Sequence, residues 1–457
     1  MIALSVSELI KITGGKLLCG TDAGTITHVT TDSRTAKEGT LFVAICGTRA
    51  DGHDYVQAVF EQGAVCALVE KECAVSGSHA VVLVDDTIKA MGQVARDVMK
   101  RLSVPAVAIT GSVGKTTTRD MTHAVLSAKF RTLKNENNFN NHLGVPLTIF
   151  KADTETEAAV IEMGMDHFGE IDRLGAMVKP DVAIVTNIGM SHIEQLGSQE
   201  NIYKAKSELF AHTKADGVVI FNGDDAILMA HKQELSQKVI TVGVSHTEAD
   251  LVASDICAKK DCVSFRVFGM GRDFNVTLPV PGEHNVINAL LACAAGIYYQ
   301  IPSGQIADAL QNFALTGMRM DIFRSSTITV INDCYNAAPA SVAAALSVLS
   351  KQAGRKVAIL GDIAALGDYS YNAHKNLGAE IVKNKIDLLI TVGQQARYIA
   401  EGAFEHGMDS SNLVSADTVE ELLSHLSSYI KENDTVLVKA SRVMGLERVT
   451  EFLKNNF

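Results

Sequence analysis

The sequence lacks an excess of basic residues, a hydrophobic run long enough to cross a membrane, and any C-x-x-C pair. Its 41 Lys and Arg residues are outnumbered by 52 Asp and Glu residues, which gives a formal net charge of −11. Because nucleic-acid binding requires a basic face, we expect no nucleic-acid partner. No apolar run reaches the ~20 residues of a membrane-spanning helix, so we expect no membrane span.

Cysteine usage and overall composition indicate a cytoplasmic α/β protein. The eight cysteines are scattered along the chain, which is typical of reduced thiols in the cytoplasm. Glu8 and Lys11 interrupt the apolar N-terminal residues, so we expect no secretory signal peptide. With 47% hydrophobic and 20% charged residues, the chain suits a well-packed α/β fold.

Alternating strands and helices divide the 457 residues into blocks that we take as three domains. Residues 1–102 form the first domain, and Ser103-Val104-Pro105 provides a hinge after it. Residues 103–316 alternate strands with helices and predict a doubly wound, mostly parallel sheet. Residues 317–457 begin another such series, which predicts a Rossmann-like domain. The expected strands are 41–45, 66–69, 80–84, 107–110, 158–161, 182–186, 217–221, 239–242, 328–331, 356–360, 388–392 and 435–439.

A glycine-rich turn follows the apolar strand in VAITGSVGKTTT, residues 107–118. Backbone N–H groups at such a turn point at phosphate oxygens. We expect Lys115 to hold the β/γ-phosphates of a nucleotide and the Thr116 hydroxyl to ligate Mg²⁺. The expected phosphate site comprises Thr110, Gly111, Ser112, Val113, Gly114, Lys115, Thr116 and Thr117.

A GTPase or P-loop kinase is the main alternative that the residues leave open. Residues 384–387, NKID, fit a guanine-reading pattern. In GTPases that motif follows a strand, whereas here it precedes the apolar run 388–392. The phosphate loop also has Ile109 where its common form has an early glycine. Both observations disfavour a GTPase.

Polar residues stand at the carboxyl ends of several expected strands. Ligands of open α/β sheets bind beyond these ends, so the pattern predicts a site between the second and third blocks. The residues are Thr110, Glu162, Asn187, Asp333, Asp362 and Lys439.

Several segments resemble, in order, motifs of the Mur ligases, the ATP-dependent amide-forming enzymes of peptidoglycan synthesis. The phosphate loop resembles T-G-S/T-x-G-K-T-T, and residues 135–146 resemble an Asn-rich segment that ends in G-V-P. Residues 162–171 resemble E-x-G-x-x-x-x-G-E-I. Residues 186–194 resemble T-N-I-x-x-x-H-x-E, and residues 281–289 resemble G-x-H-N-x-x-N-A.

The resemblance narrows to the members of this family that add D-alanyl-D-alanine. Residues 31–34 and 49–54 resemble the uridine-nucleotide domain of two family members, and residues 332–339 resemble the D-x-Y-N-x-x-P element. This implies a small α/β domain that binds the UDP-sugar-peptide, a central ATPase domain and a C-terminal acceptor domain. The implied reaction joins D-alanyl-D-alanine to UDP-N-acetylmuramoyl-tripeptide through an acyl phosphate, giving the pentapeptide, ADP and phosphate. We expect a monomer.

The resemblance also implies ATP and two Mg²⁺ sites. Thr116 is implied to hold the first Mg²⁺, Glu162 to be a metal ligand, and His192 to help hold the second. Lys206, on a stretch resembling a family helix, is implied to be carbamylated by CO₂, since a carbamate offers oxygen to Mg²⁺. The expected catalytic residues are Lys115, Glu162, His192 and Lys206, and the expected metal ligands are Thr116, Glu162, His192 and Lys206. From the residues alone, Glu162 would be a capping acid, His192 a structural histidine and Lys206 a solvated lysine.

Further residues are implied to contact the nucleotide and the other substrates. Asn285 and Asn288, neighbours if helical, are implied to meet adenine. Arg319 is implied to reach the ATP phosphates and Asp333 the ribose; a salt bridge and a helix cap are their alternatives. The residues implied to line the UDP-sugar pocket are Ser33, Arg34, Arg49 and His53. The other residues implied to contact substrate are Asn141, Tyr335, Asn336, Lys439, Ser441 and Arg442.

Three elements of the third block depart from the family pattern. Ala365 replaces the acid of D-x-x-E-L-G, Ala440 and Val443 alter K-G-S-R-G, and Ala338 replaces an asparagine. These departures concern the acceptor side, so two alternatives stay open. One is a Mur ligase that adds a single amino acid to the UDP-dipeptide, which the Tyr335-Asn336 pair disfavours. The other is a non-catalytic binding protein, which the retained phosphate and metal residues disfavour.

Overall fold

The computed structural model describes residues 1–73, 75–315 and 317–457. Helices alternate with strands through these ranges, which confirms the α/β class. None of the helices described is long and apolar enough to cross a membrane. The chain divides into two compact units: the first comprises residues 1–109, 129–183 and 207–218, and the second comprises residues 110–128, 184–206 and 219–457.

A five-stranded sheet in the first hundred residues has the order β2-β7-β6-β5-β4. Four strands are parallel, and β2 is antiparallel to β7. Its central strands are buried apolar runs, as expected of a sheet covered on both faces. The elements are β1 (Leu4–Ser5), α1 (Val6–Thr13), β2 (Lys16–Cys19), β3 (Thr25–Ile26), β4 (His28–Thr30), η1 (Ser33–Thr35), β5 (Thr40–Val43), η2 (Gly52–Tyr55), α2 (Val56–Glu61), β6 (Cys66–Val69), β7 (Ala80–Leu83) and α3 (Thr87–Leu102).

A nine-stranded sheet has the order β16-β15-β14-β13-β12-β11-β8-β10-β9. β8, β10 and β9 are parallel, and β14, β15 and β16 form an antiparallel meander at the far edge. Its strands are β8 (Ala106–Thr110), β9 (Thr132–Lys134), β10 (Ala158–Glu162), β11 (Val182–Val185), β12 (Val218–Asn222), β13 (Lys238–Gly243), β14 (Leu251–Ala258), β15 (Val263–Gly269) and β16 (Arg272–Leu278). The helices are α4 (Lys115–Ser127), α5 (Gly144–Ile149), α6 (Glu170–Val178), α7 (Ile193–Leu196), α8 (Gln199–Ser207), η3 (Glu208–His212), α9 (Ala226–Ala230), η4 (Lys232–Glu234), α10 (His284–Tyr298) and α11 (Ser303–Gln311).

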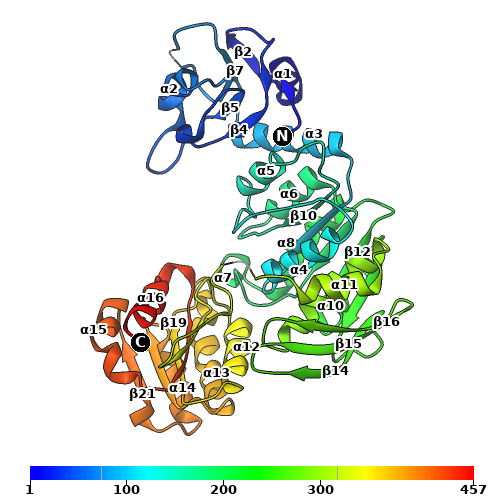
Figure 1. The fold of residues 1–457 in the computed structure, drawn as a ribbon. Helices are drawn as coiled ribbons and strands as arrows, with labels where there is room; N and C mark the ends of the chain where they lie inside the picture. The colour runs from blue at the N-terminus through cyan, green and yellow to red at the C-terminus, as the bar shows by residue number, and fades with distance from the viewer. Residues whose placement is uncertain (74, 316) are drawn as a thin grey trace. The chain divides into compact units, whose positions relative to one another are not determined.

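A six-stranded sheet, drawn in yellow to red in Figure 1, has the order β17-β18-β22-β19-β20-β21. Only β17 is antiparallel to its neighbour. Helices α15 and α16 bury their apolar side chains against one face of this sheet. Right-handed crossovers place α12, α13 and α14 on the other face. The elements are β17 (Asp321–Arg324), β18 (Thr329–Asn332), α12 (Pro339–Ser350), β19 (Lys356–Gly361), η5 (Gly367–Tyr369), α13 (Ser370–Lys383), β20 (Leu388–Val392), α14 (Arg397–Glu405), η6 (Ser410–Asn412), β21 (Leu413–Ala416), α15 (Val419–Tyr429), β22 (Thr435–Lys439), η7 (Arg442–Met444) and α16 (Glu447–Asn456).

The expected strands are present, most of them within one or two residues of their predicted ends. β6, β20 and β22 have the predicted bounds. The NKID motif follows α13 and precedes β20, and Asp387 Oδ2 accepts a hydrogen bond from the Lys356 N–H at 2.7 Å. It therefore lies at the amino end of the strand, away from the edge where a sheet of this kind binds ligands.

Helices α13 and α14 approach each other closely at two glycines. A Cβ atom on Gly378 would lie 2.2 Å from the backbone nitrogen of Ala403, and one on Gly402 would lie 2.1 Å from the Lys375 carbonyl oxygen. Neither contact involves a flexible side chain, so the crossing requires glycine at both positions.

We expect Gly378→Ala to destabilise the protein by about 1–3 kcal/mol, because the helices must separate to admit the methyl group. Urea denaturation followed by circular dichroism measures the change. Gly304→Ala in α11 is the matched control, since a Cβ there meets nothing within 4 Å. It should be neutral or stabilising by up to about 1 kcal/mol. Equal effects of the two substitutions would contradict the steric explanation.

Candidate active site

The phosphate loop joins β8 to α4 through two glycines with positive φ, 145° at Gly111 and 84° at Gly114. A Cβ on Gly111 would lie 1.9 Å from Thr186 Oγ1, and one on Gly114 would lie 2.6 Å from Asn288 Oδ1. The loop can therefore take this path only with glycine at both positions. The predicted strand, glycine turn and helix are confirmed.

Asn187 holds the loop in place. Its backbone oxygen accepts from the Ser112 N–H at 3.0 Å, its Oδ1 accepts from the Val113 N–H at 2.9 Å, and its Nδ2 donates to the Val113 carbonyl at 2.9 Å. The N–H groups of Ser112 and Val113 are thus used within the fold. Gly114 is the N-cap residue of α4, which has no side-chain cap, so the N–H groups of the first turn are the donors offered to an anion.

Two lysine side chains converge on one carbonyl oxygen. Lys115 Nζ donates to Gly111 O at 2.8 Å and to Ser112 O at 3.3 Å. Lys206 Nζ, on α8, donates to the same Gly111 O at 3.0 Å. The Lys206 side chain is almost fully buried, so the solvated-lysine alternative does not hold. Two ammonium groups around one carbonyl repel each other and favour an anion nearby.

Two threonine hydroxyls lie buried in the same loop. Thr110 is fully buried, and its Oγ1 has no hydrogen-bond partner. Thr116, the expected Mg²⁺ ligand, is also buried. A buried hydroxyl without a partner costs free energy that a bound ligand can recover, so the loop fits a phosphate–Mg²⁺ group.

Glu162 ends β10 and belongs to the first unit, where asparagines hold it. Asn135 bonds both its N–H and its carbonyl at 2.8 Å, and Asn140 Nδ2 donates to Glu162 Oε1 at 2.8 Å. The carboxylate is almost completely buried, a position that is stabilised by a cation. Asn141, the expected substrate residue, instead uses its Oδ1 to accept from the N–H groups of Leu143 and Gly144 at the start of α5.

His192 precedes α7 with a left-handed backbone, φ 65°. Such a conformation is unfavourable for a residue other than glycine and is often found at functional sites. Among the residues that the structure describes, no three His, Cys, Asp or Glu side chains gather as a metal cluster. Mg²⁺ is commonly held by a few protein oxygens together with substrate phosphates, and the expected Mg²⁺ sites stay a prediction.

Asn285 and Asn288 are neighbours on α10, as expected. Asn288 Nδ2 donates to Asn285 Oδ1 at 3.2 Å, and Asn288 Oδ1 accepts from Thr118 Oγ1 at 3.2 Å. Asn285 Nδ2 donates to Pro281 O at 2.8 Å. Both side chains are buried, and Asn288 links α10 to α4. Their expected contact with adenine stays a prediction.

Asp333 and Lys439, at the ends of β18 and β22, form a buried ion pair with Nζ 2.5 Å from Oδ2. Lys439 Nζ also donates to Asn336 O at 3.0 Å. Nearby, burial lowers the pKa of His284 to about 4, with Asp333 opposing and Lys439 reinforcing this shift. The two residues expected to face ribose and acceptor therefore neutralise each other here.

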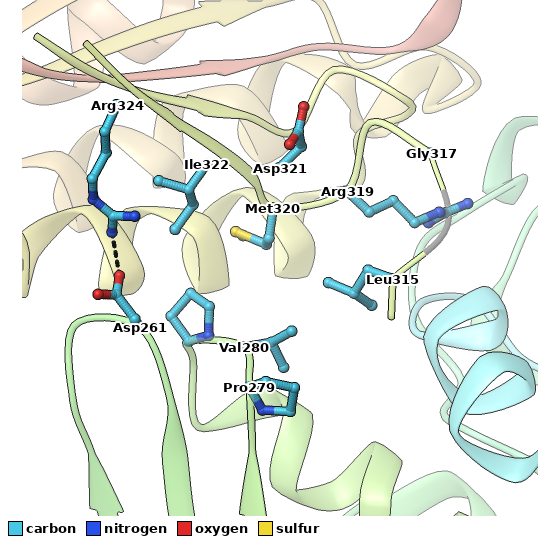
Figure 2. Close-up of a pocket in the computed structure, with 11 residues that line it drawn as sticks. Asp261, Pro279, Val280, Leu315, Gly317, Arg319, Met320, Asp321, Ile322 and Arg324 are labelled. Atoms are coloured by element: carbon cyan, nitrogen blue, oxygen red, sulfur yellow. Dashed lines mark hydrogen bonds and ion pairs between the residues drawn. The ribbon is translucent and has the colours of Figure 1, made fainter. Parts of the chain in front are cut away.

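Arg319 lies over the ring of Tyr335, with its guanidinium carbon 4.3 Å from the ring centre. Its side chain also lines a cavity of about 280 Å³ drawn in Figure 2. An ion pair between Arg324 and Asp261 bounds that cavity. Arginine stacked on an aromatic ring keeps its charge available for an anion, which suits the expected phosphate contact.

Ser441 links the ends of two strands in the third block. Its N–H donates to Asp362 O at 3.1 Å, and its Oγ accepts from the Ala364 N–H at 2.9 Å. Arg442 is more exposed and lies 3.6 Å from Glu447. Ser441 thus shapes the loop expected to contact the acceptor.

The residues expected in the UDP-sugar pocket differ in exposure and in how far their side chains are hydrogen-bonded within the fold. Arg34 is exposed, and its hydrogen bonds lower the pKa of Asp32 to about 2. Ser33 is part of the η1 turn, and Arg49 is exposed on a loop. His53 is buried: its Nδ1 lies 2.5 Å from Asp51 Oδ1, and its Nε2 accepts from the Glu70 N–H at 2.9 Å. Both ring nitrogens of His53 are therefore engaged in the fold.

Models of the Mur ligase family match three consecutive stretches of the chain. The Mur ligase family catalytic domain matches residues 25–106, the Mur ligase middle domain residues 109–296, and the glutamate ligase domain of Mur ligases residues 318–442. The chain belongs to the Mur ligase family, a family of ATP-dependent ligases.

Several relatives that are 30–38% identical to this chain share the name UDP-N-acetylmuramoyl-tripeptide–D-alanyl-D-alanine ligase. The UDP-N-acetylmuramoyl-tripeptide–D-alanyl-D-alanine ligase of Bacillus subtilis (strain 168) is 38% identical, over 99% of each chain. A crystal structure of MurF from Acinetobacter baumannii has a TM-score of 0.90 and 32% identity, covering 99% of each chain. MurF ligase from Thermotoga maritima, in complex with ADP, has a TM-score of 0.83 and 25% identity, covering 94% of this chain and 97% of that one.

We expect Thr110→Val to weaken nucleotide use without destabilising the fold. Valine preserves the shape and removes a buried hydroxyl that has no partner, so stability should be unchanged or higher by up to about 1 kcal/mol. Phosphate-release kinetics should show the KM for ATP–Mg²⁺ raised about tenfold, if one bond to the ligand is lost.

Thr186→Val is the matched control, because the Thr186 hydroxyl donates to Val113 O at 2.6 Å. Losing that bond should destabilise the fold by about 1 kcal/mol. A Thr110→Val protein with an unchanged KM would remove Thr110 from the nucleotide site.

Proposed function

We propose that this chain joins D-alanyl-D-alanine to UDP-N-acetylmuramoyl-tripeptide, with ATP converted to ADP and phosphate, to give the pentapeptide precursor of peptidoglycan. The observation that carries the proposal is the 38% identity to a ligase of that name along 99% of both chains. The phosphate loop, buried Glu162 and paired lysines give the reaction its chemistry. We also propose the domain boundaries 1–102, 103–316 and 317–457, which lie near the ends of the three family matches.

The reaction requires a carboxylate to approach the γ-phosphate of ATP although both are anionic. Lys115 and the N-terminus of α4 offset the charge on the phosphates. The carboxylate oxygen attacks the γ-phosphorus, ADP leaves, and an acyl phosphate forms. The amine of D-alanyl-D-alanine then attacks the acyl carbon, phosphate leaves, and the amine loses its proton. Mg²⁺, which Thr116 would hold, would supply further positive charge; Glu162 is proposed separately as a metal ligand.

The proposal extends to a second Mg²⁺ near His192 and to a carbamate on Lys206. Carbamylation replaces a buried ammonium with an anion beside Lys115, which relieves the repulsion around Gly111 O. It also supplies oxygen ligands of the kind that Mg²⁺ prefers. The proposed enzyme acts as a monomer in the cytoplasm.

A substrate panel tests the function. Phosphate release should require ATP, the UDP-tripeptide and D-alanyl-D-alanine together, because the acyl phosphate needs both an acid and an amine to turn over. Malachite-green detection measures the phosphate, and mass spectrometry identifies the pentapeptide. Release with the UDP-dipeptide and a single amino acid would instead assign the chain to the single-residue-adding members of the family. No release with either pair would favour the non-catalytic alternative.

Lys206→Ala tests the carbamate. We expect activity to fall at least a hundredfold, since a metal ligand is lost, and short-chain carboxylic acids to restore part of it by supplying the missing oxygens. Lys204→Ala, two residues earlier on an exposed position of the same helix, is the control and should keep its activity. Full activity of Lys206→Ala would exclude the carbamate.

A further inference from the structure

A short helix, α9, connects two segments of the candidate site without belonging to the expected catalytic set. Asp225 precedes it, and its Oδ1 accepts from the N–H groups of Ile227 and Leu228, both at 3.0 Å. The other carboxylate oxygen, Oδ2, accepts from the Ile188 N–H at 2.7 Å. One carboxylate therefore caps α9 and holds the loop that follows β11.

That loop is the support of the phosphate loop. Asn187, next to Ile188, makes three hydrogen bonds to Ser112 and Val113. On its other side, the Gly189 N–H donates to Ser112 Oγ at 2.8 Å. Asp225 thus fixes the residue between two direct supports of the phosphate loop.

The other end of α9 reaches the helix of Lys206. His231 directly follows α9, and its ring stacks on that of Tyr203 with centres 4.0 Å apart and planes 10° apart. Its Nε2 lies 3.2 Å from Glu200 Oε2, and its Nδ1 lies 2.9 Å from Glu234 Oε2. Burial opposes protonation, but the bonds to Glu234 and Glu200 prevail and raise the pKa of His231.

Tyr203 and Lys206 lie three residues apart on α8, so they occupy neighbouring positions on one side of the helix. The first residue of α8, Gln199, donates through Nε2 to Ile188 O at 2.9 Å. These contacts form a closed circuit. The phosphate loop is bonded to the Asn187 loop, which Asp225 joins to α9; His231 joins α9 to α8, and Lys206 on α8 returns to the phosphate loop at Gly111 O.

We propose that Asp225 and His231 are positioning residues, which set the phosphate loop and Lys206 relative to each other through α9. Neither residue belongs to the expected catalytic set. Asp225 acts through Ile188 on the phosphate loop, and His231 acts through Tyr203 on Lys206. The inference rests on the proposed function, because it takes Lys115 and Lys206 as the groups that need positioning.

The first test is Asp225→Ala, measured by phosphate release with all three substrates. Loss of three charge-assisted hydrogen bonds should lower kcat/KM for ATP by about tenfold or more, with a raised KM. Asp225→Asn keeps the size and one acceptor oxygen and should recover part of the loss. Asp224→Ala is the control, because Asp224 accepts from the N–H groups of Val244, Ser245 and His246, which belong to a separate loop. The kcat/KM for ATP of Asp224→Ala should stay within about twofold of the unmodified protein, although this variant loses the same charge as Asp225→Ala.

The second test is His231→Ala, compared with His231→Phe, which keeps a ring to stack on Tyr203. We expect His231→Ala to lower kcat about tenfold while the KM for ATP changes little, since the disturbance reaches Lys206 rather than the phosphate loop. His231→Phe should lie between His231→Ala and the unmodified protein. In a Lys206→Ala background, His231→Ala should add no further loss, because the two act as one unit.

Lys115→Ala separates failure of the inference from failure of the proposed function. Suppose that Lys115→Ala is inactive. If Asp225→Asn, His231→Phe and every alanine variant that folds then keep kcat and KM within about twofold of the unmodified protein, the positioning role is wrong. If Lys115→Ala stays active, the site assignment is wrong, and the positioning role falls with it. The conservative variants decide the matter where an alanine variant does not fold.

Discussion

The carbonyl oxygen of Gly111 accepts hydrogen bonds from two lysine ammonium groups, and the candidate site depends on this contact. Lys115 comes from the phosphate loop itself and Lys206 from a helix about 90 residues later in the chain. An anion nearby stabilises two positive charges that are held at one oxygen. The ATP phosphates would be one such anion, and carbamylation would instead replace the Lys206 ammonium with a negative group. The contact therefore favours negative charge at this place in the fold.

The phosphate loop, which holds the two lysine ammonium groups, also needs rigid support. A loop that gathers like charges must be held by bonds that do not depend on the ligand, and Asn187 supplies three of them. The same principle recurs at Glu162, whose backbone is bonded twice by Asn135. In both places an asparagine bonds a neighbouring backbone, because an amide carries both donor and acceptor without adding charge. The expected chemistry thus rests in part on neutral side chains that fix the backbone.

The sequence predicted the parallel strands and the polar residues at their ends, because a buried strand is a short apolar run and the next polar residue marks its end. It did not predict the meander of β14, β15 and β16, whose alternating exposure gives weaker apolar runs. The Asn-rich segment shows a second limit. Asn140 meets the Glu162 carboxylate while Asn141 caps α5, and only the backbone path decides between adjacent identical residues. Asp225 and His231 went unnoticed because their partners are distant in sequence.

The departures from the family pattern lie in the third block, which is expected to bind the acceptor, and the scaffold there limits what two of them can change. Asp362 Oδ1 accepts from the N–H groups of Gln395 and Ala396, and Ser441 ties the following loop to β22. Ala365 follows in that loop with φ 59°, and Val443 exposes 80% of its surface. Neither of these two residues carries a hydrogen bond that fixes a strand end. Ala365 and Val443 therefore alter what lines these loops and leave in place the hydrogen bonds of Asp362 and Ser441 that hold them.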